Sequence, residues 1–292
     1  MQTMTRHHMS LVVKSHCKVN LLLNVMGHRE DGFHEIETII QPLPLYDELH
    51  IERAEKGIEL TCDDPQLSVG ADNLVHRAAS EFLKSIKSGG VRIHLVKNLP
   101  LAAGIGAGSS NAAMTLRGLN ELYDYTINAE HIQILAANLG SDVPFFLQDG
   151  PALAMGRGEC VEALQPFKAL KDCGVLLIHP GFGVSTSWAY QTLGCMPEKF
   201  GAKGQAAMMM ESLAEGKLEG FSNSLESAVF PKYVVLPIIK DFFSANGARV
   251  ALMSGSGSTM FAITRDRASA EVLLAKYHDR FGQTGWSATV AL

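Results

Sequence analysis

A glycine-rich loop between a strand and a helix is the feature that most constrains this chain. The segment PLAAGIGAGSSNAA spans residues 100–113 and places Gly104, Gly106 and Gly108 ahead of two serines. Because glycine has no Cβ, the backbone of such a loop can approach an anion closely and turn its N–H groups toward it. The N-terminus of the helix that follows adds about half a positive charge. The segment therefore predicts a phosphate-binding loop.

Two commoner phosphate motifs do not match this segment. No lysine follows the glycines as in the P-loop GxxxxGK[ST], and the spacing differs from the dinucleotide motif GxGxxG. The alternative is a plain glycine turn in which Ser109 or Ser110 only caps the helix. Ala102, Ala103 and Ala107 are compatible with the loop only where φ stays negative.

The flanking sequence predicts strands and helices in alternation. Apolar residues alternate at 11–25, where Lys18 and Asn20 share a face, and a DG turn leads to a second strand at 33–43. A helix is predicted at 74–86 behind the candidate cap Asp72, with one apolar face made by Leu74, Ala78, Phe82 and Ile86. The other predicted elements are strands at 91–100 and 173–180, a strand, glycine turn and strand at 250–264, helices after the loop and at 129–140 and 268–281, and a helical or loosely ordered stretch at 196–220.

Composition and charge limit the class of protein. The 292 residues, 47% of them hydrophobic, suffice for two modest domains. A net charge of −5 argues against a nucleic-acid partner and favours a small molecule. No apolar run reaches the roughly 20 residues that span a membrane, and residues 1–10 lack the apolar centre of a signal peptide, so we expect a cytoplasmic protein with no membrane partner. Five scattered cysteines predict reduced thiols without a disulfide framework or a zinc site.

Two further segments carry candidate chemistry. Asp142 follows the helix stop Gly140 and precedes Pro144 by two residues. A carboxylate held in such a turned junction suits a fixed base, although the same position suits the cap of a short helix. The turn SGSGS at 254–258 either closes over a phosphate or makes a tight hairpin.

Together these segments resemble the motifs of the GHMP kinases, the superfamily named for galactokinase, homoserine, mevalonate and phosphomevalonate kinases. The resemblance covers nearly the whole chain and implies an α+β fold. Residues 1–160 would form a ribosomal-protein-S5-domain-2-like, ATP-binding domain, and residues 161–292 a ferredoxin-like C-terminal domain. Segments 18–38, 72–79, 100–113 and 140–146 are similar to the branch that uses ATP to phosphorylate the 2-hydroxyl of a cytidine-diphosphate-linked methylerythritol, in the non-mevalonate pathway of isoprenoid biosynthesis.

The resemblance also implies roles for single residues. Asp142 corresponds to the general base and Lys18 to the lysine beside it, which suits an alcohol acceptor that must lose a proton as negative charge accumulates. Asn73 and Lys97 match positions that border adenine. Mg²⁺ is implied together with ATP, and no metal ligand is predicted. The ATP phosphates would lie on Pro100, Leu101, Ala102, Ala103, Gly104, Ile105, Gly106, Ala107, Gly108, Ser109 and Ser110.

For the cytidine end of the substrate, the resemblance points to aromatic residues. Phe33 and His34 follow the DG turn and Tyr190 supplies a second ring, so that two rings can sandwich a pyrimidine. Phe33 stands where the family has tyrosine, and it keeps the stacking surface without the hydroxyl. Thr186 and Asn20 are further candidates for substrate contact. The alternatives are a hairpin core residue for Phe33 and a satisfied surface histidine for His34.

Two other functions remain open at this point. Another small-molecule kinase of the superfamily, of the homoserine or mevalonate type, would share the phosphate loop but not the opening segment. A non-catalytic nucleotide-binding relative is the second alternative, and the presence of both Lys18 and Asp142 argues against it. His16 and Cys17 stand where the family has a small residue and a proline, and Cys17 is expected to be a semi-buried filler.

Overall fold

The computed structural model describes residues 10–87 and 89–292, and the chain divides into two compact units. Of the described residues, the first unit comprises 10–16, 46–87, 89–99 and 107–147, and the second comprises 17–45, 100–106 and 148–292. The long strands β1 (Ser10–His28) and β2 (His34–Ala54) contribute residues to both units. The expected domain boundary at residue 160 stays a prediction, and residues 1–9 of the expected first domain lie outside the described part.

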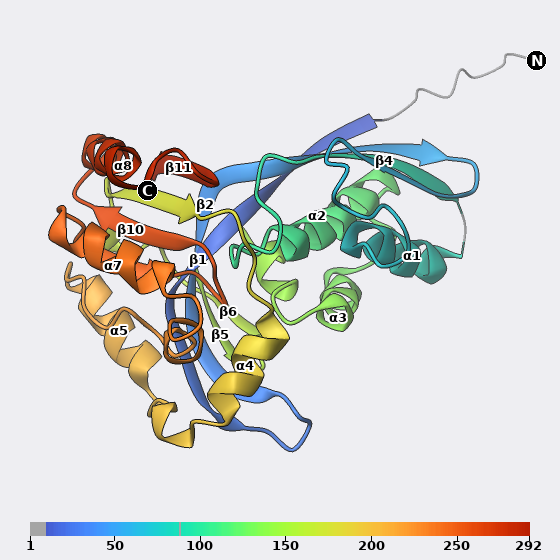
Figure 1. Cartoon of the computed structure of the whole chain (residues 1–292). Coiled ribbons are helices and arrows are strands. Elements are labelled where there is room, and N and C mark those ends of the chain that lie inside the picture. The colour runs from blue at the N-terminus through green and yellow to red at the C-terminus, as the bar shows by residue number, and fades with distance from the viewer. Residues whose placement is uncertain (1–9, 88) are drawn as a thin grey trace, which may run out of the picture. The chain divides into compact units, whose positions relative to one another are not determined.

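The first unit is a sheet with helices packed together beside it (Figure 1). Its strand order is β3 (Gly57–Cys62), β4 (Gly90–Val96), β2 and β1, with β3 parallel and β2 antiparallel to β4. Helix α1 (Leu74–Ile86) packs against α2 (Ala107–Leu122), and α3 (Ala129–Leu139) contacts both. The short 3-10 helix η1 (Pro144–Leu147) contacts α2 and α3. The helices predicted for this unit are confirmed, whereas the strand predicted at 91–100 ends at Val96, and β3 has no counterpart among the predicted elements.

Helix α1 has the predicted bounds but a different cap. Asn73 Oδ1 accepts the N–H of Val75 at 2.8 Å, whereas Asp72 accepts the Ser68 hydroxyl at 2.7 Å and does not cap the helix. The buried face is also shifted from the predicted one, because a strict four-residue spacing drifts around a helix of 3.6 residues per turn. Its fully buried members are Val75, Ala78, Ala79 and Phe82.

The sheet of β1 and β2 continues in the second unit, which also contains a sheet of its own. In the continuing sheet, residues of β1 pair in parallel with β8 (Ser222–Asn223), and β2 pairs with β5 (Ala152–Gly156), which pairs with β6 (Cys160–Ala163). The second sheet has the order β11 (Trp286–Ala291), β7 (Gly174–His179), β10 (Met260–Thr264) and β9 (Val250–Met253), with every pair antiparallel.

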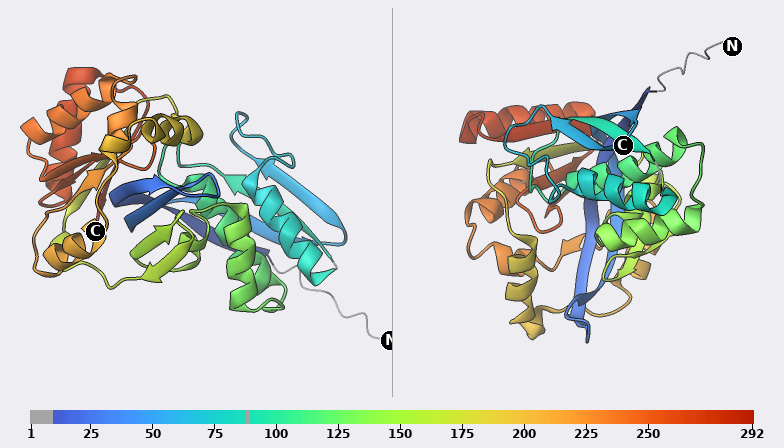
Figure 2. Two further views of the ribbon diagram at one scale, coloured as in Figure 1. Left: turned by 90° about the horizontal axis from the view of Figure 1, so that it is seen from below. Right: turned by 90° about the vertical axis from the view of Figure 1, so that its right-hand side faces the viewer.

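Helices pack on this second sheet, as Figure 2 shows. Helix α7 (Val235–Ala245) contacts β9 and β10, and α8 (Arg267–Phe281) contacts β7, β10 and β11. The remaining helices of the unit are η2 (Lys168–Leu170), α4 (Thr186–Gly194), η3 (Pro197–Lys199), α5 (Gln205–Ala214) and α6 (Glu226–Val229). The stretch 196–220, predicted as helical or loosely ordered, therefore contains two short helices.

A buried carboxylate orders the start of α5. Glu37 on β2 is 6% exposed and accepts the N–H groups of Gly204 and Ala206, each at 3.2 Å. Asn24 donates to the same carboxylate at 2.9 Å and to the carbonyl of Ala202 at 2.8 Å. An acidic group is favourable at a helix N-terminus because unpaired N–H groups meet there. The start of the helix is therefore tied to β1 and β2.

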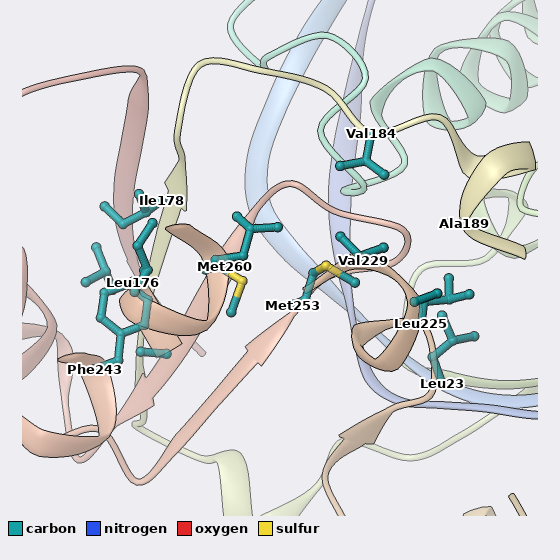
Figure 3. Close-up of a cluster of buried hydrophobic side chains, with 14 of the residues drawn as sticks. Leu23, Leu176, Ile178, Val184, Ala189, Leu225, Val229, Phe243, Met253 and Met260 are labelled. Atoms are coloured by element: carbon teal, nitrogen blue, oxygen red, sulfur yellow. The ribbon is translucent and has the colours of Figure 1, made fainter. Parts of the chain in front are cut away.

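An apolar cluster of the second unit fixes the SGSGS turn (Figure 3). Met253 and Met260, which flank the turn, are fully buried with Leu176 and Ile178 of β7. Burial of each such side chain contributes about 1.5–3 kcal/mol. Because both flanking residues lie in this cluster, the turn between them has fixed ends.

Two further features concern the described part of the chain alone. None of its helices is both long and apolar enough to cross a membrane. All five cysteines are described and none forms a disulfide. Cys17 is fully buried and not semi-buried as predicted, and this burial fits a small core residue.

Candidate active site

Lys18 projects from β1 with its side chain almost wholly buried. The residue is 2% exposed, and its Nζ donates to Asn20 Oδ1 at 2.6 Å. Asn20 Nδ2 donates to Thr38 Oγ1 at 2.9 Å, and Thr38 gives its own proton to the carbonyl of Leu22 at 2.5 Å. Since Thr38 has no second proton, the Asn20 amide must donate to it and turn its oxygen toward Lys18. The predicted common face of Lys18 and Asn20 is thus confirmed.

The first half of the glycine loop is held from two sides within the second unit. The backbone N–H of Lys18 donates to the carbonyl of Ile105 at 3.0 Å. On the other side, Ser254 Oγ donates to the carbonyl of Gly104 at 3.0 Å. A Cβ at Gly104 would lie 2.3 Å from the Ser254 carbonyl oxygen, so this glycine is required by the approach of the SGSGS turn.

The φ angles of the loop suit its glycines but are unfavourable at one of its alanines. Gly104 and Gly106 have φ values of 76° and 73°, in the left-handed region that glycine favours. Ala102 has φ 49°, so the expectation that every loop alanine keeps a negative φ is wrong at this position. Ala102 itself is exposed, but the next residue, Ala103, is buried and its carbonyl accepts the N–H of Thr259 at 3.2 Å, so contacts from outside the loop hold the backbone here against the local preference of alanine.

The second half of the loop is the first turn of α2. The helix begins at Ala107, so Gly108, Ser109 and Ser110 have helical backbone and the serines do not occupy the cap position. Ser110 is 1% exposed, whereas Ser109 is half-buried. Ser109 is therefore the more accessible hydroxyl for a ligand.

Asp142 lies in the turn that joins α3 to η1, as predicted. The N–H of Val143 donates to the carbonyl of Gly140 at 3.1 Å, and the N–H of Phe146 donates to the carbonyl of Val143 at 3.1 Å. Val143 and Phe145 are buried at 0% and 1% exposure, which anchors the turn on both sides of Pro144. The half-buried carboxylate of Asp142 thus stands on a rigid backbone.

The two residues predicted to border adenine have their polar ends engaged within the first unit. Besides capping α1, Asn73 donates to the carbonyl of Ser68 at 2.6 Å. The ammonium of Lys97 pairs with Asp47, and the two side chains are 4% and 0% exposed. Beyond these bonds Asn73 Nδ2 keeps a second hydrogen and the Lys97 ammonium keeps two, so both side chains can still donate to a nucleotide.

Rings predicted to hold cytidine gather in the second unit. The ring centroids of His34 and Tyr190 lie 5.3 Å apart, and His28 lies 4.4 Å from His34. His34 is 9% exposed, and within the described part of the chain its buried Nε2 has no hydrogen-bond partner. Burial, together with the neighbouring His28, lowers the pKa of His34. The alternative of a satisfied surface histidine is therefore wrong.

Of the other two residues predicted to contact the substrate, Phe33 is exposed, whereas Thr186 contacts the SGSGS turn. Phe33 is 47% exposed at the β1–β2 turn, so the alternative of a hairpin core residue is wrong. The guanidinium of Arg157 lies 5.0 Å from the centroid of the Phe33 ring, a cation–π arrangement. Thr186 Oγ1 lies 2.8 Å from Ser256 Oγ and links α4 to the SGSGS turn.

Sequence reasoning missed the buried polar residues behind the loop. Asp47 is fully buried on β2, in phase with the buried Leu49 and Ile51. Ser15 and Asn111 are likewise buried, at 0% and 3% exposure. The sequence does contain a signal for this network, since Asp47 stands at a core-facing position of an alternating strand. A charge at such a position must find partners inside the protein.

Comparison with known proteins places this chain in a family. The model of the GHMP kinases N terminal domain matches residues 73–150, and that of the GHMP kinases C terminal domain matches residues 209–283. The 4-diphosphocytidyl-2-C-methyl-D-erythritol kinase of Pelobacter propionicus is 37% identical, over 97% of this chain and 98% of the relative. The kinase of the same name from Syntrophus aciditrophicus is 42% identical, over 91% and 95%.

A solved structure agrees with these relatives. The crystal structure of 4-(cytidine 5'-diphospho)-2C-methyl-D-erythritol kinase is 35% identical and superimposes with a TM-score of 0.80, covering 97% of this chain and 100% of that one. The predicted two-part α+β GHMP kinase fold is thereby confirmed. The chain belongs to the GHMP kinases and, within them, to the 4-diphosphocytidyl-2-C-methyl-D-erythritol kinase family.

Proposed function

We propose that this enzyme transfers the γ-phosphoryl group of MgATP to the 2-hydroxyl of 4-diphosphocytidyl-2-C-methyl-D-erythritol, in the non-mevalonate route to isoprenoids. The observation that carries the proposal is the double role of Lys18. Its backbone N–H bonds to the glycine loop at Ile105, and its buried ammonium is oriented by Asn20. A fixed cation beside a phosphate-binding loop is what phosphoryl transfer requires.

In the proposed reaction Asp142 acts as the general base. It accepts the proton of the substrate hydroxyl while the hydroxyl oxygen forms a bond to the γ-phosphorus. The bond between the γ-phosphorus and the bridging oxygen breaks, and ADP leaves with the electron pair. Lys18 offsets the negative charge that accumulates during transfer, and N–H groups of the loop 100–110 bind the ATP phosphates.

Magnesium enters this reaction as part of MgATP. Within residues 10–87 and 89–292, no three histidine, cysteine or acidic side chains are grouped so as to hold a metal ion. Mg²⁺ keeps several waters and binds largely through substrate phosphates, so we assign its delivery to the nucleotide.

Two different bases would be recognised, adenine of ATP and cytosine of the acceptor. We assign the adenine border to Asn73 and Lys97, and the cytosine site to Phe33, His34 and Tyr190. Two observations support the second assignment: His34 Nε2 is buried without a hydrogen-bond partner among the described residues, and the ring of Phe33 is exposed. Thr186 and Asn20 would contact the remaining part of the substrate.

The test is a competition among acceptors. The purified protein is incubated with ATP and Mg²⁺ and, separately, the cytidyl substrate, homoserine or mevalonate, while ADP release and product mass are followed. Selective phosphorylation of the cytidyl substrate is expected. Turnover only with another alcohol would change the substrate and keep the mechanism, whereas nucleotide binding without any ADP would reject the enzymatic proposal.

A further inference from the structure

Asp47 is a fully buried carboxylate in the first unit that accepts four hydrogen bonds. Its Oδ1 accepts the backbone N–H groups of Asn98 at 2.8 Å and Leu99 at 2.9 Å. Its Oδ2 accepts Asn111 Nδ2 at 3.1 Å and the ammonium of Lys97. An ionised carboxylate offers about four lone-pair sites, so every acceptor position of Asp47 is used.

These partners lie on both sides of the phosphate loop. Residues 97–99 directly precede Pro100, whereas Asn111 lies near the start of α2, directly after the loop. Ser15 on β1 extends the network, because its hydroxyl donates to Asn111 Oδ1 at 2.6 Å and lies 2.8 Å from Ser110 Oγ. A single side chain on β2 therefore ties together the two ends of the segment 100–110.

We propose that Asp47 is a positioning residue that sets the spacing between the two ends of the phosphate loop and, through Asn111 and Ser15, the place of Ser110. The proposal rests on the function proposed above, in which this loop binds ATP phosphates. If Asp47 served only to neutralise the ammonium of Lys97, one of its four hydrogen bonds would be enough. The two bonds to backbone N–H groups act on the chain entering the loop, and a buried ion pair adds little stability by itself.

The decisive variant is Asp47→Asn. The amide keeps the shape of the side chain but presents an NH₂ group where Asn111 or Lys97 needs an acceptor. Loss of one charge-assisted hydrogen bond corresponds to about a tenfold change in an equilibrium constant. We expect the Kd of a non-hydrolysable ATP analogue with Mg²⁺ to rise about tenfold by calorimetry, while the Kd of the cytidyl substrate changes less than about twofold. Ser15→Ala should raise the ATP-analogue Kd by a smaller factor.

Two controls separate positioning from lost stability. Phe82→Leu creates a cavity under α1 and should lower the melting temperature without changing the ATP-analogue Kd. The double variant Asp47→Asn with Lys97→Met removes the unpaired buried ammonium and should recover stability. Because Lys97 is itself assigned to the adenine border, the double variant is compared with Lys97→Met alone, and it should bind the ATP analogue more weakly than that single variant. Equal ATP affinity of these two variants would show that Asp47 only neutralises Lys97.

The outcomes also distinguish this inference from the function on which it rests. Failure of the unaltered protein to bind the ATP analogue would reject the proposed function itself. Normal ATP affinity in Asp47→Asn, or equal weakening of both ligands in proportion to the lost melting temperature, would reject only the positioning role.

Discussion

Lys18 Nζ donates to Asn20 Oδ1 at 2.6 Å, and the two residues project from the same face of one strand. The position of the ammonium is therefore set by a neighbour two residues along the chain. Thr38 on the adjacent strand fixes which way the Asn20 amide faces.

A substitution at Asn20 should consequently lower the activity by releasing the ammonium of Lys18 from its position. Asn20→Ala leaves the buried ammonium without its amide acceptor, and we expect kcat to fall by about tenfold with the KM for ATP nearly unchanged. Thr38→Val removes only the hydroxyl that orients Asn20, so it should lower kcat by a smaller factor than Asn20→Ala. Steady-state kinetics of both variants test the order, and a larger effect of Thr38→Val would contradict it.

Variants of the two proposed catalytic groups should lose turnover ahead of affinity. Lys18→Ala and Asp142→Asn act where charge develops in the transition state, so we expect kcat to fall by about 100-fold or more. The Kd of an ATP analogue, measured separately by calorimetry, should change only a few-fold. An equal loss of nucleotide affinity would reject the assignment.

Substitutions at two loop glycines should change stability in opposite directions. At Gly104 a Cβ would lie 2.3 Å from the Ser254 carbonyl oxygen, so Gly104→Ala should lower the melting temperature and weaken ATP binding. At Gly108 the nearest atom is Leu74 Cδ1 at 3.6 Å, an ordinary contact. Gly108→Ala should therefore raise the free energy of unfolding by up to about 1 kcal/mol, through helix propensity, while hindering the approach of phosphate. Thermal unfolding with and without ATP checks both.

The strained alanine of the loop gives a stability prediction of its own. Ala102 has φ 49°, which costs an L-residue about 1–2 kcal/mol relative to glycine, less the greater unfolded-state freedom of glycine. Ala102→Gly should raise the free energy of unfolding by about 0.5–1 kcal/mol in urea titrations. The neighbouring Ala103→Gly, at a buried position with no positive φ, should lower it and serves as the matched control.

Acid should destabilise the protein partly through His34. Burial and His28 lower the pKa of His34 below its ordinary value of 6.5, so the folded state favours the neutral ring. As pH falls through 6.5, the unfolded chain takes up a proton that folded His34 resists, and the free energy of unfolding decreases. Each such group contributes a slope of at most about 1.4 kcal/mol per pH unit.

His34→Gln should therefore flatten the decline in stability between about pH 7 and pH 5. Urea titrations across this range measure the slope. His50→Gln is the control, because the side chain of His50 is 45% exposed. If His34→Gln left the slope unchanged, the proton uptake would belong to another group. The next residue to substitute is then His179, because burial lowers its pKa as well.

The sequence by itself determined the local elements of this protein. Helix α1 ends where its pattern predicts, β1 covers the strand predicted at 11–25, and the glycine loop lies between β4 and α2. These features were predictable because helix and strand periods and the conformational freedom of glycine act over a few neighbouring residues. The motif resemblance likewise identified the family, because its segments are contiguous.

Only the tertiary structure decided which distant residues meet. Asp47 bonds to residues 97–99 and to Asn111, and the carbonyl of Gly104 receives the Ser254 hydroxyl from a turn 150 residues away. The positive φ of Ala102 and the burial of His34 also depend on such packing. Sheet register and helix packing set these contacts, and both minimise a free energy summed over the whole chain, which no short segment of sequence contains.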